Sequence, residues 1–206
     1  YNLAVRQAPV VAKQVQSIQQ LSDNRFDFGV GISPWEEDFA VCDVPWERRG
    51  KRFDEQLAIL IGLESGDFFS FEGELHNMPA NKMCPAPTAP TPILMGGHSD
   101  PALKRAARIG DGWMCAGADM AQLTDYITKL NHWRKEYGTA EKPFKIFTTG
   151  QNAFTPEGIA ELEALGVTDV VIAFRNVYEL EPDHSLEKKI QMLNWYATEF
   201  IGPHRA

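Results

Sequence analysis

A short polar run between a predicted strand and a predicted helix has the composition of an anion-binding loop. Gly96 and Gly97 lack the Cβ atoms that would hold a phosphate away from the backbone. His98 and Ser99 add donors where the helix begins. A helix N-terminus carries unpaired N–H groups and the positive end of the helix dipole, so it attracts anions. The same letters would also make a tight turn before an ordinary helix start, and two glycines alone do not separate these interpretations.

The remaining reactive side chains do not form a pattern typical of a metal site or of a nucleophile. Cys42, Cys84 and Cys115 are far apart and form no CxxC pair, and no histidine has metal-ligand spacing. We therefore expect no metal and no disulfide framework, and we interpret Cys115 as buried and inert. A reducing cytoplasm is the default compartment for such a chain.

The composition is that of a globular protein with an acidic surface. The chain has 206 residues, 44% hydrophobic and 23% charged, with a formal net charge of −8. Nucleic acids and anionic membranes are bound through basic surfaces, and a membrane helix needs about 18 consecutive apolar residues, which the sequence lacks. We therefore expect neither a nucleic-acid nor a membrane partner.

Helix and strand patterns alternate along the sequence. The expected strands are 26–32, 93–97, 112–116, 144–149 and 168–174, with a stub at 1–5. Helices are expected after each of them: behind Pro9, over 53–61, from Pro101 with Asp100 as N-cap, over 123–130, from Thr155-Pro156 to Gly166, and over 186–197. A hairpin at 68–78 and a Pro-rich surface segment at 79–92 interrupt the alternation.

Strict alternation of this kind predicts an α/β fold with a parallel sheet and right-handed crossovers. The pattern alone leaves two architectures open, an open doubly wound sheet and a piece of a (β/α)8 barrel. Neither an internal repeat nor a linker divides the chain, so residues 1–206 are expected to form a single domain.

Four blocks of sequence resemble the bacterial-luciferase-like oxidoreductases in order and spacing. They are "LSDNRFDFGVGISPWEEDF…ERRGKRFDEQLAIL", "FEGELHNM", "PILMGGHSDPALKRAARIGDGW" and "FTPEGIAELEALGVTDVVIAF". Within that family they most resemble the branch that uses the deazaflavin coenzyme F420. The resemblance implies a (β/α)8 TIM barrel with its active site at the C-terminal ends of the strands. The chain would then hold about strands 3 to 8, without the first two to three.

The resemblance also implies roles for individual residues. Gly97, His98 and Ser99, with Gly96 before them, align with the loop that holds the coenzyme phosphate. Gly31 ends the strand whose tip approaches the flavin edge, where a glycine lets the backbone lie against a flat ring.

Two further residues are candidates for binding substrate. Arg175 directly follows "VVIAF" at the predicted rim, where it would clamp a carboxylate or make a surface salt bridge. Trp35 would cover the pocket or anchor its own loop. The basic run at 47–52 is interpreted as a solvated helix start, with the alternative that it reaches a coenzyme tail.

The implied activity is hydride transfer between F420 and a small organic substrate. The alternatives are a monooxygenase that uses flavin mononucleotide (FMN), and a non-catalytic, flavin-binding truncated barrel. No catalytic residue is assigned, because the family's reactive residues are expected upstream of this chain. A homodimer is expected by analogy alone. Ala116 and Asp119 stand near the positions where F420-dependent glucose-6-phosphate dehydrogenases hold a sugar phosphate with Thr and Lys, which argues against that substrate.

Overall fold

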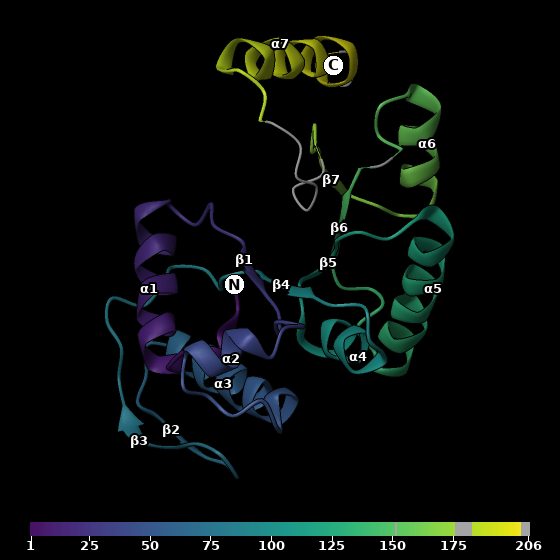
Figure 1. Cartoon of the computed structure of the whole chain (residues 1–206). Helices are drawn as coiled ribbons and strands as arrows, with labels where there is room; N and C mark the ends of the chain where they lie inside the picture. Colours follow the sequence, from purple (N-terminus) through teal and green to yellow (C-terminus); the bar gives the residue numbers. More distant parts are fainter. Residues whose placement is uncertain (151, 176–182, 203–206) are drawn as a thin grey trace. The chain divides into compact units, whose positions relative to one another are not determined.

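The computed structural model describes residues 1–150, 152–175 and 183–202, which form two compact units. The first unit comprises Tyr1–Met114 and Lys129–Phe144, and the second comprises residues 115–128 together with those from 145 onward (Figure 1). Each unit contains parallel strands and the helices that connect them, as the alternating sequence pattern predicted. That residues 1–206 form a single domain stays a prediction.

The first unit is built on three parallel strands. They are β1 (Phe28–Val30), β4 (Ile93–Gly96) and β5 (Gly112–Cys115), in the order β1-β4-β5. Val30 pairs with Met95, and Gly96 pairs with Met114. Because the strands are parallel and in this register, the loops that follow β1 and β4 emerge at the same edge of the sheet.

Four helices accompany these strands: α1 (Ala8–Leu21), α2 (Glu37–Val41), α3 (Arg49–Glu64) and α4 (Asp100–Ile109). α1 packs against α3. Val11 and Val15 on α1, and Phe53, Leu57 and Leu60 on α3, have side chains at most 3% exposed. The helical spacing in the sequence therefore marked most of the face of each helix that enters the core, although Ile18 and Ile61, at the same spacing, are 43% and 41% exposed.

The expected hairpin consists of β2 (Phe69–Glu72) and β3 (Asn77–Asn81), which pair antiparallel. Its first strand packs on α3, where the ring of Phe69 lies over Gly62. A Cβ at Gly62 would come within 2.3 Å of the Phe69 ring, so the absence of a side chain allows this close approach.

The second unit contains the parallel strands β6 (Lys145–Thr149) and β7 (Asp169–Val171). Its helices are α6 (Pro156–Ala164) and α7 (Leu186–Tyr196), which is followed by a π-helical turn at Ala197–Ile201. The predicted cap of α6 is confirmed, because the Thr155 hydroxyl accepts a hydrogen bond from the Gly158 N–H at 3.1 Å. The long helix α5 (Met120–Glu136) begins in the second unit and ends in the first.

Several local predictions were wrong. Residues 1–5 are not a strand stub: Asn2 alone bridges to Gly31, and Leu3–Val5 form a buried 3-10 turn closed by the Arg6 N–H on Leu3. Ser99, not Asp100, is the N-cap of α4, because Asp100 already has helical geometry in front of Pro101.

The last strand and one helix also differ from expectation. β7 spans only Asp169–Val171 of the predicted strand 168–174, and Val171 is 44% exposed. The apolar stripe of α7 is likewise exposed, with Leu186 and Leu193 accessible over 73% and 59% of their surface. The short helix α2 was not predicted, since its five residues are too few to show a helical period.

Candidate functional site

The ends of β1 and β4 bring two of the predicted glycines together. A Cβ placed on Gly31 would lie 3.8 Å from the Cα of Gly96, and one on Gly96 would lie 3.5 Å from the carbonyl oxygen of Val30. The two residues thus form a floor of bare backbone at the edge where the parallel strands end. A flat ring could approach such a surface closely, which neighbouring side chains would otherwise prevent.

The next residue, Gly97, gives the loop its shape. Its φ is +113°, a conformation that residues with a side chain rarely adopt, and a Cβ there would lie 2.9 Å from that of Ala102. The Gly97 carbonyl accepts a hydrogen bond of 2.9 Å from the indole N–H of Trp113. Since Trp113 is fully buried, this bond fixes the loop to the core.

His98 and Ser99 follow at the start of α4. The Ser99 backbone is extended, and its carbonyl accepts the N–H groups of Ala102 and Leu103, so the helix begins without a side-chain cap. The His98 ring stands edge-on to Trp113, with centroids 6.2 Å apart. Partial burial lowers the pKa of His98 below its ordinary value, so the imidazole is uncharged at neutral pH and bonds as a neutral group.

A cavity of about 530 Å³, here called the first cavity, contains this loop. It lies entirely in the first unit. Its walls consist of residues 31–34, 48–50, Phe53, 96–99, Pro101, Ala102 and Arg105. The wall includes three arginines and no acidic residue, so its charge favours an anion.

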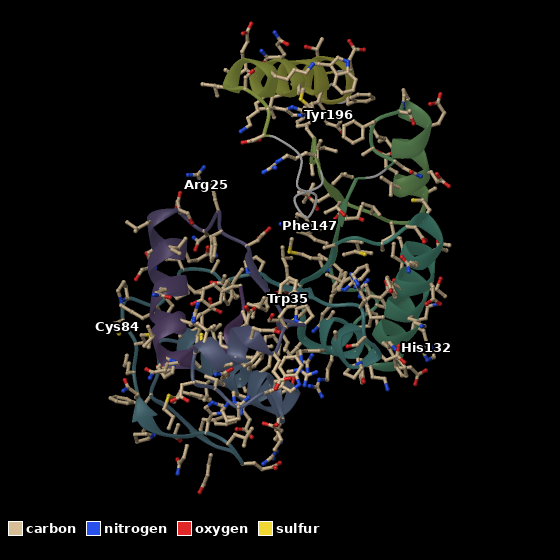
Figure 2. The ribbon with its side chains drawn as sticks, viewed as in Figure 1. Arg25, Trp35, Cys84, His132, Phe147 and Tyr196 are labelled. Carbon is tan, nitrogen blue, oxygen red and sulfur yellow. The ribbon has the colours of Figure 1, made fainter. Side chains whose placement is uncertain are left out.

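A second cavity of about 510 Å³ adjoins the first and shares Gly31, Ile32, Ser33 and Gly96 with it. The predicted Trp35 lines this second cavity, is 53% exposed, and donates its backbone N–H to the Ser33 hydroxyl at 3.2 Å (Figure 2). Asp38, Tyr1 and Met114 also line it. The glycine floor therefore lies between a basic cavity and a largely apolar one.

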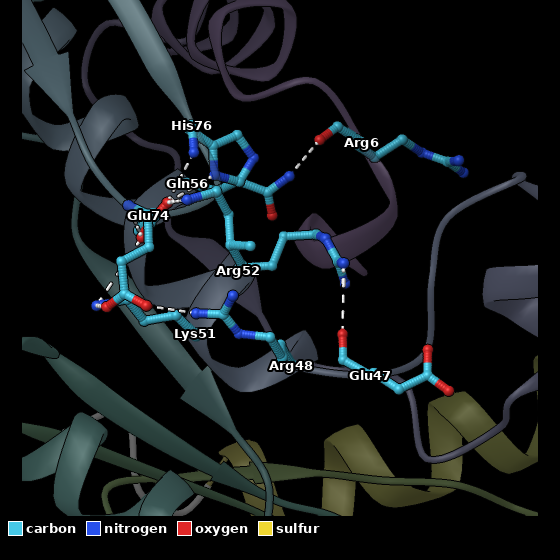
Figure 3. Close-up of polar contacts among 10 residues, drawn as sticks. Arg6, Glu47, Arg48, Lys51, Arg52, Gln56, Glu74 and His76 are labelled. Carbon is cyan, nitrogen blue, oxygen red and sulfur yellow. Dashed lines mark hydrogen bonds and ion pairs between the residues drawn. The ribbon is translucent and has the colours of Figure 1, made fainter.

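A buried carboxylate ties the hairpin to the helix that carries the basic wall. Glu55 on α3 is 5% exposed and accepts the backbone N–H groups of residues 74, 75 and 76 at 2.9–3.0 Å, together with the His76 ring N–H at 3.0 Å. Glu74 then pairs with Arg48 and, at 2.9 Å, with Lys51 (Figure 3). Burial raises the pKa of Glu55, but the hydrogen bonds outweigh it and hold that pKa below its ordinary value.

Two of the residues considered from the sequence lie in the second unit. Arg175 follows β7, and its Nε lies 3.7 Å from the Asp183 carboxylate, so its contact with a substrate stays a prediction. Asp119 caps α5 by accepting the Gln122 N–H at 2.8 Å, while its own N–H bonds the Gln122 side chain at 3.1 Å. This capping box accounts for an acid at position 119 without any ligand.

Cys115, which the sequence indicated to be buried and inert, has those surroundings. Cys115 is 3% exposed, and burial raises the pKa of its thiol to about 11, so it is not a thiolate at neutral pH. His132 on α5 is exposed (Figure 2). Within residues 1–150, 152–175 and 183–202, no three His, Cys, Asp or Glu side chains cluster closely enough to hold a metal ion. In the same ranges no helix is long and apolar enough to cross a membrane.

The sequence did not reveal two components of this site. Arg105 reaches the first cavity while paired to Asp54, which is 51 positions earlier, and nothing in the local sequence marks that pair. The indole of Trp113 holds the Gly97 carbonyl, a bond between residues 16 positions apart that no local pattern marks. A buried tryptophan needs a partner for its N–H, and that requirement was the one available signal.

Comparison with known proteins supplies the family. The model for luciferase-like monooxygenases matches residues 1–175. The chain belongs to this family. An uncharacterized protein of Mycobacterium tuberculosis is 46% identical over 201 residues, which is 97% of this chain and 69% of that protein. The similarity to this relative thus extends over almost the whole of this luciferase-like chain.

Two characterised relatives differ in the coenzyme that their names state. The FMNH(2)-dependent dimethylsulfone monooxygenase of Pseudomonas fluorescens is 27% identical over 170 residues, 81% of this chain and 45% of that protein. The F420-dependent glucose-6-phosphate dehydrogenase of Amycolatopsis mediterranei is 28% identical over 122 residues, 57% of this chain and 37% of that protein. The coenzymes in these two names are reduced FMN and F420.

Solved structures support the fold. The monooxygenase RslO1 from Streptomyces bottropensis matches with a TM-score of 0.78 at 15% identity, over 99% of this chain and 76% of that one. The coenzyme F420 dependent tetrahydromethanopterin reductase from Methanopyrus kandleri matches with a TM-score of 0.73 at 15% identity, over 98% and 80%. The α/β fold with parallel strands is therefore that of the luciferase-like TIM barrels.

Proposed function

We propose that this luciferase-like chain binds coenzyme F420 and serves hydride transfer between that coenzyme and a small organic substrate. The observation that carries the proposal is that an anion-binding loop, here called the cradle (Gly97–Ser99 and the start of α4), adjoins the floor of bare backbone at Gly31 and Gly96. Gly97–Ser99 and the start of α4 lie at one end, and the Gly31–Gly96 floor opens into the second cavity at the other. A molecule with a flat ring and an anionic chain matches both ends.

The protein's own part in this reaction is to bind, orient and exclude water. The backbone N–H groups at the start of α4 favour the phosphate, while the uncharged His98 adds a hydrogen bond. The floor at Gly31 and Gly96 accepts one face of the ring, and Trp35 and Met114 line the space beside it. When bound, a deazaflavin supplies the hydride chemistry through the carbon at position 5 of its ring.

The relative with FMN in its name favours a second candidate, a monooxygenase that uses reduced FMN. The same cradle would accept the FMN phosphate, and that relative aligns with more of this chain than the F420-dependent one does. The two functions differ in their reaction with oxygen. A reduced flavin reacts readily with oxygen, whereas a reduced deazaflavin does not.

Titration of F420 and FMN into the purified protein, followed by tryptophan fluorescence, separates the candidates. Trp35 lines the second cavity and Trp113 touches the cradle, so a ligand in either place should quench the emission. The proposal predicts micromolar binding of F420 and weaker binding of FMN, with no oxygen uptake when reduced F420 is supplied. Retention of FMN with oxygen uptake would support the monooxygenase. Binding of neither would contradict both.

A further inference from the structure

The first cavity is lined by three arginines, two of which come from a different element than the Gly97–Ser99 loop and α4. Arg48 and Arg49 come from the beginning of α3, and Arg105 comes from α4. α3 begins without a side-chain cap and without an acid in its first turn, so its N–H groups and dipole add positive potential to the same wall. The starts of two helices and three guanidinium groups therefore meet at one cavity.

The three arginines are not equivalent. Arg105 is held in place, because its side chain is only 10% exposed and donates hydrogen bonds to both carboxylate oxygens of Asp54, at 2.5 and 3.2 Å. Arg48 pairs with Glu74 and is half-exposed. Arg49 stacks on the Trp46 ring, with Cζ 3.5 Å from its centroid. In the described parts of the chain no carboxylate lies within ion-pair distance of Arg49, so its charge is the least compensated.

The first cavity is larger than one phosphate needs. Its volume of about 530 Å³ is in the range of whole ligand sites, roughly 300–1,000 Å³. A phosphate at Gly97–Ser99 would leave the wall at Arg48 and Arg49 available for a further anionic group. A guanidinium binds carboxylates through two parallel N–H bonds, and stacking on a tryptophan holds Arg49 in place for such a contact.

We infer that the part of the first cavity lined by Arg48 and Arg49, here called the arginine wall, is a second anion subsite. This subsite binds the carboxylates of the oligoglutamate tail of coenzyme F420. The inference rests on the proposed function. F420 continues from its phosphodiester into a chain of glutamates, whereas FMN ends in a single phosphate. The wall therefore favours the longer and more anionic coenzyme, and Arg49 makes the largest contribution because its charge is not already balanced.

The test compares F420 that carries several glutamates with the form that carries none, by equilibrium titration of the purified chain. We expect the tail to strengthen binding about tenfold at low salt, and the gain to shrink as salt is added. Arg49→Gln should remove most of this gain while binding of the tail-less form is unchanged. Arg108→Gln is the matched control, since Arg108 is also on the first unit but lines a different cavity.

Each outcome separates this inference from the proposed function. Equal affinity of the two F420 forms for the unmodified protein would overturn the second subsite and leave F420 binding intact. If Arg49→Gln weakened the binding of both F420 forms equally, the second subsite would also be overturned, because the Arg49 charge would then act on the coenzyme phosphate. Failure of both forms to bind, with FMN bound instead, would overturn the proposed function and the subsite together. Thermal unfolding of Arg49→Gln verifies that the variant is folded.

Discussion

At the scale of single residues, Gly97 is the position at which conformation and site coincide. Its backbone angle, the lack of room for a Cβ beside Ala102 and its bond to Trp113 all constrain this position. The letters Gly-Gly-His-Ser indicated an anion loop, but they did not indicate which glycine carries the strain. Gly96 has no positive φ, and a Cβ there would make ordinary contacts with Val30 and Gly31 at 3.5 and 3.9 Å, whereas Gly97 leaves no room for a side chain.

We predict that Gly97→Ala lowers the free energy of unfolding by about 1 to 2 kcal/mol, because a Cβ there is strained by the positive φ and meets Ala102. Coenzyme binding should fall more than stability does. Gly138→Ala is the control, since Gly138 has a φ of +67° with nothing nearby, and it should cost stability without changing binding. Urea unfolding and coenzyme titration measure the two effects, and unchanged binding in Gly97→Ala would refute the cradle.

At the scale of elements, the hairpin and α3 act together through Glu55. One buried carboxylate satisfies three consecutive backbone N–H groups of the β2–β3 turn, and the same turn provides the partner of Arg48. The sequence indicated the hairpin and the helix separately. Their connection could not be predicted, because a glutamate within an amphipathic helix normally faces solvent.

We predict that Glu55→Gln destabilises the protein by about 2 kcal/mol at neutral pH, because an amide cannot accept all the N–H groups that the carboxylate does. The pKa of Glu55 is lowered in the folded state, so its stabilising contribution is present above its ordinary value of 4.5 and is lost as the pH falls below that value. Urea unfolding against pH should therefore show a smaller acid-induced loss in Glu55→Gln. The exposed Glu72→Gln serves as control, and an identical pH profile for Glu55→Gln and the unmodified protein would contradict this role.

At the scale of the whole molecule, the two cavities and every residue of the cradle lie in the first unit. A bound coenzyme should therefore stabilise that unit directly. The second unit contains Arg175 and the exposed stripe of α7, whose apolar residues bury little surface in the described part of the chain.

We predict that F420 at about 100 times its Kd raises the unfolding free energy of the first unit by about 2.7 kcal/mol. Calorimetry with and without coenzyme measures the shift, and hydrogen exchange of α3 and α6 assigns each transition to its unit. If the protein unfolds in two transitions, only that of the first unit should move. A shift confined to the second unit would show that the coenzyme binds elsewhere.

The sequence by itself determined the alternating elements and the core-facing sides of most helices, though not of α7, and it placed the Gly-Gly-His-Ser loop at residues 96–99 between a strand and a helix. These features follow from local periodicity, from glycine's missing Cβ and from helix-start residues, all of which are readable over a few positions. The sequence also indicated the family, because four blocks in this order and spacing are together more specific for a family than any one motif.

Only the tertiary structure decided which distant residues meet. Gly31 lies against Gly96 because β1 and β4 are parallel neighbours in one register, and Arg105 pairs with Asp54 because α3 and α4 border the same cavity. Contacts of this kind depend on how whole elements pack, so the local propensities of the residues do not predict them. The meeting of three arginines and the Gly97–Ser99 loop at one cavity is therefore a product of the fold.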